Sequence, residues 1–298
     1  MTTTIPDIAL IIPSLTGVGE ALRTCIARQT LPPQTVEVVA GVTPNGRARN
    51  LGVAHTTADL LLFMDDDALP GNTHLVAHLV APLLADPTVG VTGAARILPP
   101  DASAWQRYVA REVPRIVHPV VATTQETNPD PPSFYCDITT TCCAMRRAVF
   151  TQVGGFNEML IRGVDTEFFV RVRRRGYRLL LVGQTWVYHP APNNLRALLH
   201  KHFLYGMGHA QEVCADPTRA RGRWLYTPLH AAGYVLLRTL LLLPNIFLPY
   251  SFAAPTWRPG CKPLKALTSY AAALGYVAGW YTVARRMRYA ERTKRTGM

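Results

Sequence analysis

The chain has 298 residues, of which 48% are hydrophobic, and a formal net charge of +12 at pH 7. This length can bury a full core in one large domain or two small ones. A basic excess indicates nucleic acid, anionic lipid or phosphorylated ligands as partners. No lysine-rich arm or zinc-finger spacing supports nucleic acid, so we exclude it and expect a membrane surface and phosphate ligands.

The cysteines and the amino terminus favour a cytosolic setting. The six cysteines are irregularly spaced and form no CxxC pair, which is typical of reduced thiols. Cys142 and Cys143 are adjacent, so in a strand they face opposite ways and are interpreted as packing residues. Acid at Asp7 and the lack of a basic n-region predict that there is no signal peptide.

Strands and helices alternate along the first third of the chain. The apolar runs predict strands over 8–12, 36–42, 60–64 and 89–92, and the helical spacings predict helices over 19–29, 47–55 and 74–85. Such alternation favours an α/β fold with a mostly parallel sheet and helices on both faces.

The pattern is weaker after residue 98 and recovers near residue 139. We predict a helix over 105–113 and a loop over 129–132, and order again over 139–149. A helix is expected over 166–175, with Asp165 as its N-cap and Gly176 at its end. The last predicted strands, 179–182 and 186–188, lead into His189-Pro190.

Three adjacent acids, Asp65, Asp66 and Asp67, follow the apolar run 60–64. A like-charge pair about 4 Å apart costs roughly 1 kcal/mol in water and roughly 4 near a protein surface. Asp65 and Asp67 are expected to share one side of an extended segment, because side chains alternate along a strand, and this pair suits a hard divalent ion. The alternative is a solvated acidic turn that caps the next helix.

Polar residues at other predicted strand ends point to the same edge of the sheet. Pro13-Ser14 ends the first strand, Asp165 begins a helix, and His189 follows the last strand. Taken singly, Asp165 is more simply an N-cap and His189 an ordinary surface histidine. Because ligands of open α/β sheets gather at the carboxyl ends of the strands, these residues together indicate a binding site.

Several segments between residues 8 and about 190 also carry a resemblance in chain order. They are Ile11-Ile12-Pro13-Ser14, Ala48-Arg49-Asn50-Leu51-Gly52, Asp65-Asp66-Asp67, Arg146-Arg147, Gly154-Gly155-Phe156-Asn157-Glu158, Gly163-Val164-Asp165-Thr166-Glu167 and Arg173-Arg174-Arg175-Gly176-Tyr177. Together they resemble the inverting glycosyltransferases of family 2, which have the GT-A nucleotide-sugar-binding fold. The three aspartates match the family's DxD element.

The resemblance implies a role for each candidate site residue. Mg²⁺ or Mn²⁺ held by Asp67, with His189, would bridge the diphosphate of a nucleotide sugar and stabilise the leaving group. Asp165 would be the general base that takes the proton of the acceptor hydroxyl. The donor-binding residues would be Pro13, Ser14, Arg49, Asp65 and Asp66, with Asp65 or Asp66 contacting the ribose or supporting the metal.

Two departures from the family pattern affect these expectations. The aspartate pair that usually follows the second strand is missing, because residues 36–42 run almost directly into Pro44-Asn45-Gly46. The base of the nucleotide (UDP, GDP or dTDP) therefore stays open. Val164 stands where the family usually has a glutamate, next to Asp165.

The region after about Pro192 has a different character. Residues 195–211 predict a basic amphipathic helix suited to a membrane surface. Apolar stretches follow over 234–252 and 267–283, and we expect a membrane hairpin, with interfacial helices or a soluble helical cap as alternatives. Basic clusters before the first stretch (Arg219, Arg221, Arg223) and after the second would place both ends on the cytoplasmic side.

The segment Lys201-His202-Phe203-Leu204-Tyr205-Gly206-Met207-Gly208 is similar to a helix of membrane-attached family members. Those members build exopolysaccharide or lipid-linked glycans on lipid-linked or glycan acceptors. We therefore predict a GT-A catalytic domain over 1–192 and a helical membrane-associated region over 193–298. The predicted function is metal-dependent sugar transfer at the membrane in cell-envelope polysaccharide assembly, with the catalytic domain cytoplasmic.

Two other functions remain open at this stage. Nucleotidyl transfer to a sugar phosphate uses a related sheet but normally opens with a Gly-rich phosphate loop, and none follows Ile12. A catalytically degenerate sugar-nucleotide-binding protein or membrane partner is supported by the altered base pocket alone.

Overall fold

The computed structural model describes residues 7–127, 137–215, 227–246 and 262–296, which form two compact units. The first, here the sheet unit, comprises Met1–Arg107, Arg115–Glu158 and Val164–Ala191. The second, the helical unit, comprises Tyr108–Pro114, Met159–Gly163 and Pro192–Met298. Some sequence features lie outside the described residues: Cys136, Cys261, the loop 129–132, the end of the apolar stretch 234–252, and Arg219, Arg221 and Arg223.

The sheet unit contains one eight-stranded sheet. Its strands are β1 (Ile8–Ser14), β2 (Thr35–Ala40), β3 (Leu60–Met64), β4 (Leu69–Pro70), β5 (Val89–Ile97), β6 (Gln125–Glu126), β7 (Cys142–Arg146) and β8 (Arg178–Tyr188). The order is β2-β1-β3-β7-β5-β8-β4, and β6 pairs with β8. β7 is antiparallel to both β3 and β5, so β1, β2, β3, β5 and β8 share one direction. The predicted α/β class with a mostly parallel sheet is confirmed.

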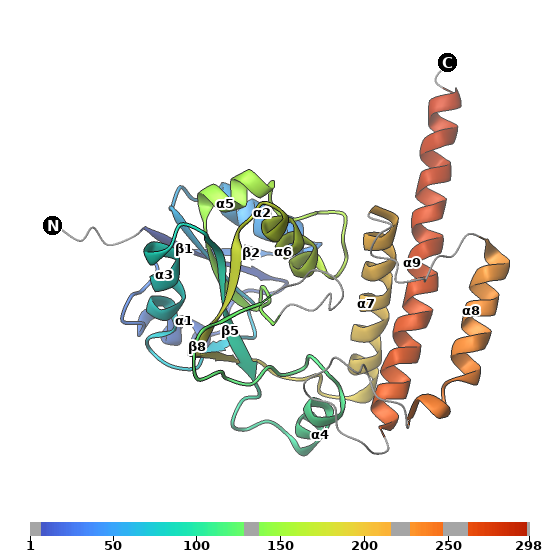
Figure 1. Cartoon of the computed structure of the whole chain (residues 1–298), viewed down its shortest axis with the longest axis horizontal. Helices are drawn as coiled ribbons and strands as arrows, with labels where there is room; N and C mark the ends of the chain where they lie inside the picture. The colour runs from blue at the N-terminus through green and yellow to red at the C-terminus, as the bar shows by residue number, and fades with distance from the viewer. Residues whose placement is uncertain (1–6, 128–136, 216–226, 247–261, 297–298) are drawn as a thin grey trace. The chain divides into compact units, whose positions relative to one another are not determined.

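Helices cover both faces of this sheet (Figure 1). They are α1 (Glu20–Ala27), α2 (Asn45–Ala54), α3 (Leu75–Ala85), α5 (Arg147–Val153) and α6 (Val164–Arg174). α1 and α3 bury Leu22 and Leu79 in the same cluster as Leu10. On the other face, Phe63 of β3 lies against Phe150 and Phe156. Alternate residues of the strands therefore build two apolar layers.

The approach of α2 to the sheet depends on a glycine. A Cβ at Gly52 would lie 2.5 Å from Cγ2 of Ile11 and 3.2 Å from Cγ2 of Val39. A side chain at this position would push α2 away from β1 and β2, because packed interiors do not absorb an added group without strain. The glycine of the Ala48–Gly52 segment is thus a packing requirement.

Two sequence predictions about the edges of elements are wrong. The strands expected over 179–182 and 186–188 are one strand, β8, with a register shift opposite Gly93 and Ala95 and a left-handed φ of 53° at Gln184. The helix expected to begin after an Asp165 cap begins at Val164, so Asp165 lies in the first turn of α6. Gly176 does end that helix, with φ 87°.

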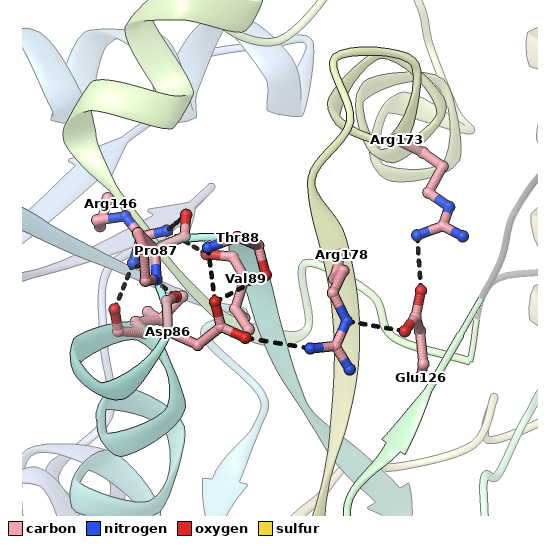
Figure 2. Close-up of polar contacts among 9 residues, drawn as sticks. Asp86, Pro87, Thr88, Val89, Glu126, Arg146, Arg173 and Arg178 are labelled. Carbon is pink, nitrogen blue, oxygen red and sulfur yellow. Dashed lines mark hydrogen bonds and ion pairs between the residues drawn. The ribbon is translucent and has the colours of Figure 1, made fainter.

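An ion-pair network lies at the amino ends of β5 and β8 (Figure 2). Arg178 contacts Asp86 at 3.1 Å and Glu126 at 2.9 Å, and Arg173 contacts Glu126 at 2.6 Å. Nearby, Arg146 donates to backbone carbonyls, among them that of Pro87 at 2.6 Å. Since ligands of such sheets bind at the opposite, carboxyl edge, the network has a structural role.

The helical unit contains α7 (Leu195–Ala215), α8 (Pro228–Leu240), a short 3₁₀ helix (Pro244–Ile246) and α9 (Pro263–Thr296). The remaining helix, α4 (Ala104–Glu112), crosses the boundary between the units. Among the described residues, no helix is both long enough and apolar enough to cross a membrane.

Candidate active site

The three aspartates form a turn at the carboxyl end of β3. The backbone N–H of Asp65 donates to the carbonyl of Thr141 at 3.1 Å, and that of Ala68 donates to the carbonyl of Asp65 at 3.1 Å. The segment is therefore a turn and not the extended chain that the sequence predicted. The turn gives each of the three carboxylates a different protein partner.

Asp65 is paired with Arg49 of α2. Nη2 of Arg49 lies 2.6 Å from Oδ1 of Asp65, and the arginine side chain is 3% exposed. Its guanidinium also lies 5.9 Å from the ring centre of Phe156, and its buried Nε has no hydrogen-bond partner among the described residues. The positive charge of Arg49 in the core therefore offsets part of the negative charge of the three aspartates.

Asp66 is turned toward the end of β1. The hydroxyl of Ser14 donates to Oδ2 of Asp66, and Oγ of Ser14 accepts from the backbone N–H of Gly17 at 2.9 Å. Pro13 precedes it as a buried β1 residue opposite Val39 of β2. Pro13, Ser14 and Asp66 thus lie at the carboxyl ends of the neighbouring strands β1 and β3.

Asp67 and His189 meet at the same edge. Nε2 of His189 lies 3.3 Å from Oδ1 of Asp67, whose side chain is 52% exposed. One ligand atom each from Asp65, Asp67 and His189 fall within 4.8 Å of one another. Two carboxylate oxygens and one imidazole nitrogen form a donor set that fits a divalent ion, and the exposure of Asp67 leaves space for further ligands.

Asp165 lies half-buried in the first turn of α6, where its Oδ1 accepts from the backbone N–H of Thr166 at 2.9 Å. Burial raises the pKa of the buried Cys143 thiol of β7 well above its ordinary value, and Cys142 adds to the rise. The charge of Arg49 opposes the rise, and the charges of Asp165 and Asp65 add to it.

Glu167, the other acid of this turn, is already neutralised. Arg171 donates to both of its carboxylate oxygens, at 2.7 and 2.8 Å, and also to the carbonyls of Val153 and Gly155. Both carboxylate oxygens of Glu167 are therefore engaged in a bidentate pair. Because Val164 stands where the resemblance predicts an acid, Asp165 is the remaining acid of this turn.

Asn50, in the motif segment 48–52, is hydrogen-bonded to the motif segment 154–158. Its amide nitrogen donates to the carbonyl of Phe156 at 2.9 Å and to Glu158 at 2.8 Å, and its Oδ1 accepts from the N–H of Phe156 at 2.9 Å. Arg147 similarly donates to the carbonyl of Ala58 at 2.6 Å. These residues support the site without facing it.

The second strand ends without an acid at the site. Residues 41–44 connect β2 directly to α2, and Gly41 turns the chain with φ 70°. The acid of β2, Glu37, lies within the strand and 3.5 Å from His55. The aspartate pair that the resemblance predicts after the second strand is thus absent from residues 41–44.

The sequence did not single out Arg96, near the carboxyl end of β5. Its guanidinium donates to the hydroxyls of Thr139 at 3.2 Å and Thr141 at 3.4 Å and to the carbonyl of Ile116 at 3.2 Å. Since Thr141 in turn accepts from the N–H of Asp65, Arg96 supports the turn of the site. The only sequence feature that could have indicated this role is a single arginine near the end of an apolar strand.

Cys142 and Cys143 are buried strand residues, as predicted for packing. Burial raises the pKa of both thiols, so they are neutral and poor nucleophiles. The four described cysteines are free.

The mostly parallel sheet, the acidic turn at its carboxyl edge and the carboxylate in the first turn of α6 are the features expected of a GT-A type glycosyltransferase domain. Residues 7–206 match the family model described as "Glycosyltransferase like family 2". Since this match covers more than half of the chain, the protein belongs to that family, and the predicted enzyme class is confirmed. No curated protein matches the sequence.

Solved structures of glycosyltransferases are similar to this chain at low sequence identity. A mannosyltransferase from Pyrobaculum calidifontis in complex with GDP-Man and Mn²⁺ matches with a TM-score of 0.47 and 16% identity, covering 95% of this chain and 76% of that one. S. aureus TarS 1–349 in complex with UDP matches with a TM-score of 0.46 and 13% identity, covering 95% and 92%. At these TM-scores the assignment rests on the family match.

Proposed function

We propose that this enzyme transfers a sugar from a nucleoside diphosphate sugar to an acceptor hydroxyl, with inversion at the anomeric carbon. The observation that carries the proposal is the group of Asp65, Asp67 and His189, with ligand atoms within 4.8 Å of one another at the carboxyl edge of the sheet. Donor binding is assigned to Pro13, Ser14, Arg49, Asp65 and Asp66, with Arg49 acting through Asp65.

The metal ligands are Asp67 and His189, with Asp65 as a third donor. Mg²⁺ is bound by oxygen ligands in proteins, whereas an imidazole ligand suits the transition metals better. We therefore propose Mn²⁺ before Mg²⁺. When bound, the ion would neutralise charge on the departing nucleoside diphosphate.

Asp165 is the proposed general base. It takes the proton of the acceptor hydroxyl as the acceptor oxygen bonds to the anomeric carbon, and the bond from that carbon to the diphosphate oxygen breaks with its electron pair on the diphosphate. Asp165 lies in the first turn of α6 and is only half-buried, which leaves its carboxylate accessible to an acceptor hydroxyl.

We also propose that the acceptor is a lipid-linked or polysaccharide glycan at the membrane, with the catalytic domain cytoplasmic. The resemblance of residues 201–208 and the net charge of +12 support this. Large exposed apolar side chains on α8 and the turn after it add to the support: Leu229 (79%), Leu236 (60%), Leu240 (67%) and Leu243 (70%). Such a concentration of exposed apolar side chains is typical of an interaction surface.

A thermal-shift screen of UDP, GDP and dTDP with and without Mn²⁺ tests donor binding. We expect one nucleotide to raise the Tm only with Mn²⁺. A transfer assay with Asp165→Asn then tests the base: turnover is lost and Mn²⁺-dependent nucleotide binding survives, whereas Glu20→Gln, an exposed first-turn acid of α1, has no effect. Turnover near the wild-type level in Asp165→Asn would remove Asp165 from the role, and binding without turnover in the wild type would favour a degenerate binding protein.

A further inference from the structure

Two histidines, His74 and His78, lie one turn apart at the start of α3 in the sheet unit. Of the nine histidines in the sequence, they are the single pair that is four residues apart, a spacing that places two side chains on the same side of a helix. The centres of their rings are 5.8 Å apart and the ring planes differ by 20°. Both residues are exposed, so the pair presents two imidazoles to a ligand from solvent.

The backbone at the start of α3 is held by the residues that follow α1. The amide nitrogen of Gln29 donates to the carbonyl of Asn72 at 3.0 Å, and its Oε1 accepts from the N–H of Val76 at 3.2 Å. The backbone N–H of Thr30 donates to the carbonyl of Thr73 at 2.8 Å. The first turn of α3 therefore has a fixed backbone before any ligand binds.

Each of the two rings is held at Nδ1 by a threonine hydroxyl. Nδ1 of His74 lies 3.2 Å from Oγ1 of Thr30, and Nδ1 of His78 lies 3.2 Å from Oγ1 of Thr185. The two hydroxyls come from different parts of the sheet unit, because Thr30 follows α1 and Thr185 is a fully buried residue of β8. Both rings are therefore oriented by partners outside α3.

The proton of each threonine hydroxyl is donated elsewhere. Thr30 donates its proton to the carbonyl of Thr73 at 3.2 Å, and Thr185 donates its proton to the carbonyl of Gly183 at 2.9 Å. Because a hydroxyl has one proton and a carbonyl oxygen only accepts, each threonine oxygen accepts from the Nδ1–H of its histidine. The neutral imidazole then carries its lone pair on Nε2.

The two Nε2 atoms have the properties of metal ligands. Neither of them has a hydrogen-bond partner within the described part of the chain. Metal-binding histidines have the same arrangement, in which the nitrogen that does not bind the metal donates its N–H to an outer partner. Imidazole nitrogen suits Zn²⁺, Ni²⁺ and Cu²⁺, whereas Mn²⁺ is at the weak end of the affinity order of divalent metals. The pair therefore selects a different class of metal from the proposed active site.

We propose that His74 and His78 form a metal site, separate from the active site, that binds a late first-row transition metal such as Zn²⁺ through both Nε2 atoms. Water completes the coordination of the ion, and Thr30 and Thr185 orient its two protein ligands. The site lies within the sheet unit and uses no residue of the proposed active site. A bound ion connects the two ends of the first turn of α3, so it stabilises the folded protein by mass action.

The test is a calorimetric titration of Zn²⁺ into a full-length background variant, Asp67→Asn with His189→Ala, which lacks two ligands of the proposed active site. We expect a saturable Zn²⁺-binding phase whose Kd is weakened about tenfold or more by His74→Gln and by His78→Gln. Thr185→Val keeps the shape of the side chain and removes the outer partner of His78. Since loss of an outer partner costs about 10–100-fold in metal affinity, this variant should weaken the Kd by about tenfold or more.

His55→Gln, which replaces a single exposed histidine at the end of α2, is the matched control and should bind Zn²⁺ like the background variant. Thermal melts provide a second measurement: Zn²⁺ should raise the Tm of the background and of His55→Gln more than that of His74→Gln or His78→Gln. The inference is overturned if the background shows no saturable Zn²⁺ binding, or if either histidine variant of α3 keeps the background Kd. An unchanged Kd in Thr185→Val would overturn the assignment of Nε2 of His78 as the ligand atom.

Discussion

Replacing Arg49 by methionine removes the positive charge within the core that faces the acidic turn. The guanidinium is 3% exposed and lies 2.6 Å from Asp65, which is 25% exposed. Methionine keeps much of the aliphatic volume of the arginine, so packing against Phe156 is largely preserved. The change therefore isolates the loss of the ion pair at Asp65, beside two further aspartates.

The cost follows from the burial of the pair. Removing one partner of a fully buried ion pair costs about 3–5 kcal/mol, because the other charge stays behind uncompensated. Water reaches Asp65, so we expect about 2–3 kcal/mol. At about 2–4 °C per kcal/mol for a domain of this size, the Tm of the metal-free variant should fall by about 4–12 °C.

Thermal melts in EDTA and in Mn²⁺ provide the assay. A divalent ion replaces the lost counter-charge, so Mn²⁺ should raise the Tm of Arg49→Met more than that of the wild type. Arg47→Met, an exposed arginine one residue before Ala48 on the same helix, is the control and should change the Tm by less than about 1 °C. A metal-free Tm of Arg49→Met equal to that of the wild type, or no larger response to Mn²⁺, would refute the reasoning.

Three further predictions concern stability. The hydrogen bond from Arg178 lowers the pKa of Glu126 below 4.5. The stability that ionised Glu126 contributes is therefore present above that pH and is lost as the pH falls through the pKa of the folded state. Arg178→Ala should flatten the fall in Tm between pH 5 and 3, and equal slopes for the two proteins would contradict this. Burial lowers the pKa of His202 from 6.5 to about 4, so stability is lost as the pH falls from 6.5 toward 4. The Tm of His202→Leu should fall less between pH 7.5 and 5 than the Tm of the wild type. An equal fall in the two proteins would exclude this linkage. A Cβ at Gly275 of α9 would collide with the carbonyl of Phe203 of α7. Gly275→Val should overpack α9 against α7, which lowers the free energy of unfolding by at least about 1–3 kcal/mol and lowers the Tm. Gly233→Val on α8, where a Cβ meets nothing within 4 Å, should not. Similar melts for the two variants would show that the close α7–α9 contact is not required.

The sheet could be predicted because its signals are local. The apolar runs of β1 and β3 are short and fully buried, and the polar residues at their ends, Ser14 and the three aspartates, predicted a binding site at the carboxyl edge of the sheet. Asp67 and His189 were paired in the same way, since each follows a strand. Strand ends and motifs are properties of neighbouring residues, which a sequence displays directly.

The partners of the site residues could not be predicted, because they depend on contacts between distant parts of the chain. Nothing near Asp66 indicates that its carboxylate meets the hydroxyl of Ser14, and nothing near His78 indicates the hydroxyl of Thr185. The turn after β3 was misjudged for the same reason, since a hydrogen bond to Thr141 shapes it.

The central claim is a metal-dependent nucleotide site built on Asp67. Calorimetric titration of Mn²⁺ into the full chain with UDP, GDP or dTDP present tests it most directly, with Asp67→Asn as the variant. We predict saturable Mn²⁺ binding with one of these nucleotides and at least a tenfold weaker Kd in Asp67→Asn, which corresponds to about 1.4 kcal/mol or more. Equal Mn²⁺ affinity in the two proteins, or no Mn²⁺ binding with any of the three nucleotides, would contradict the account.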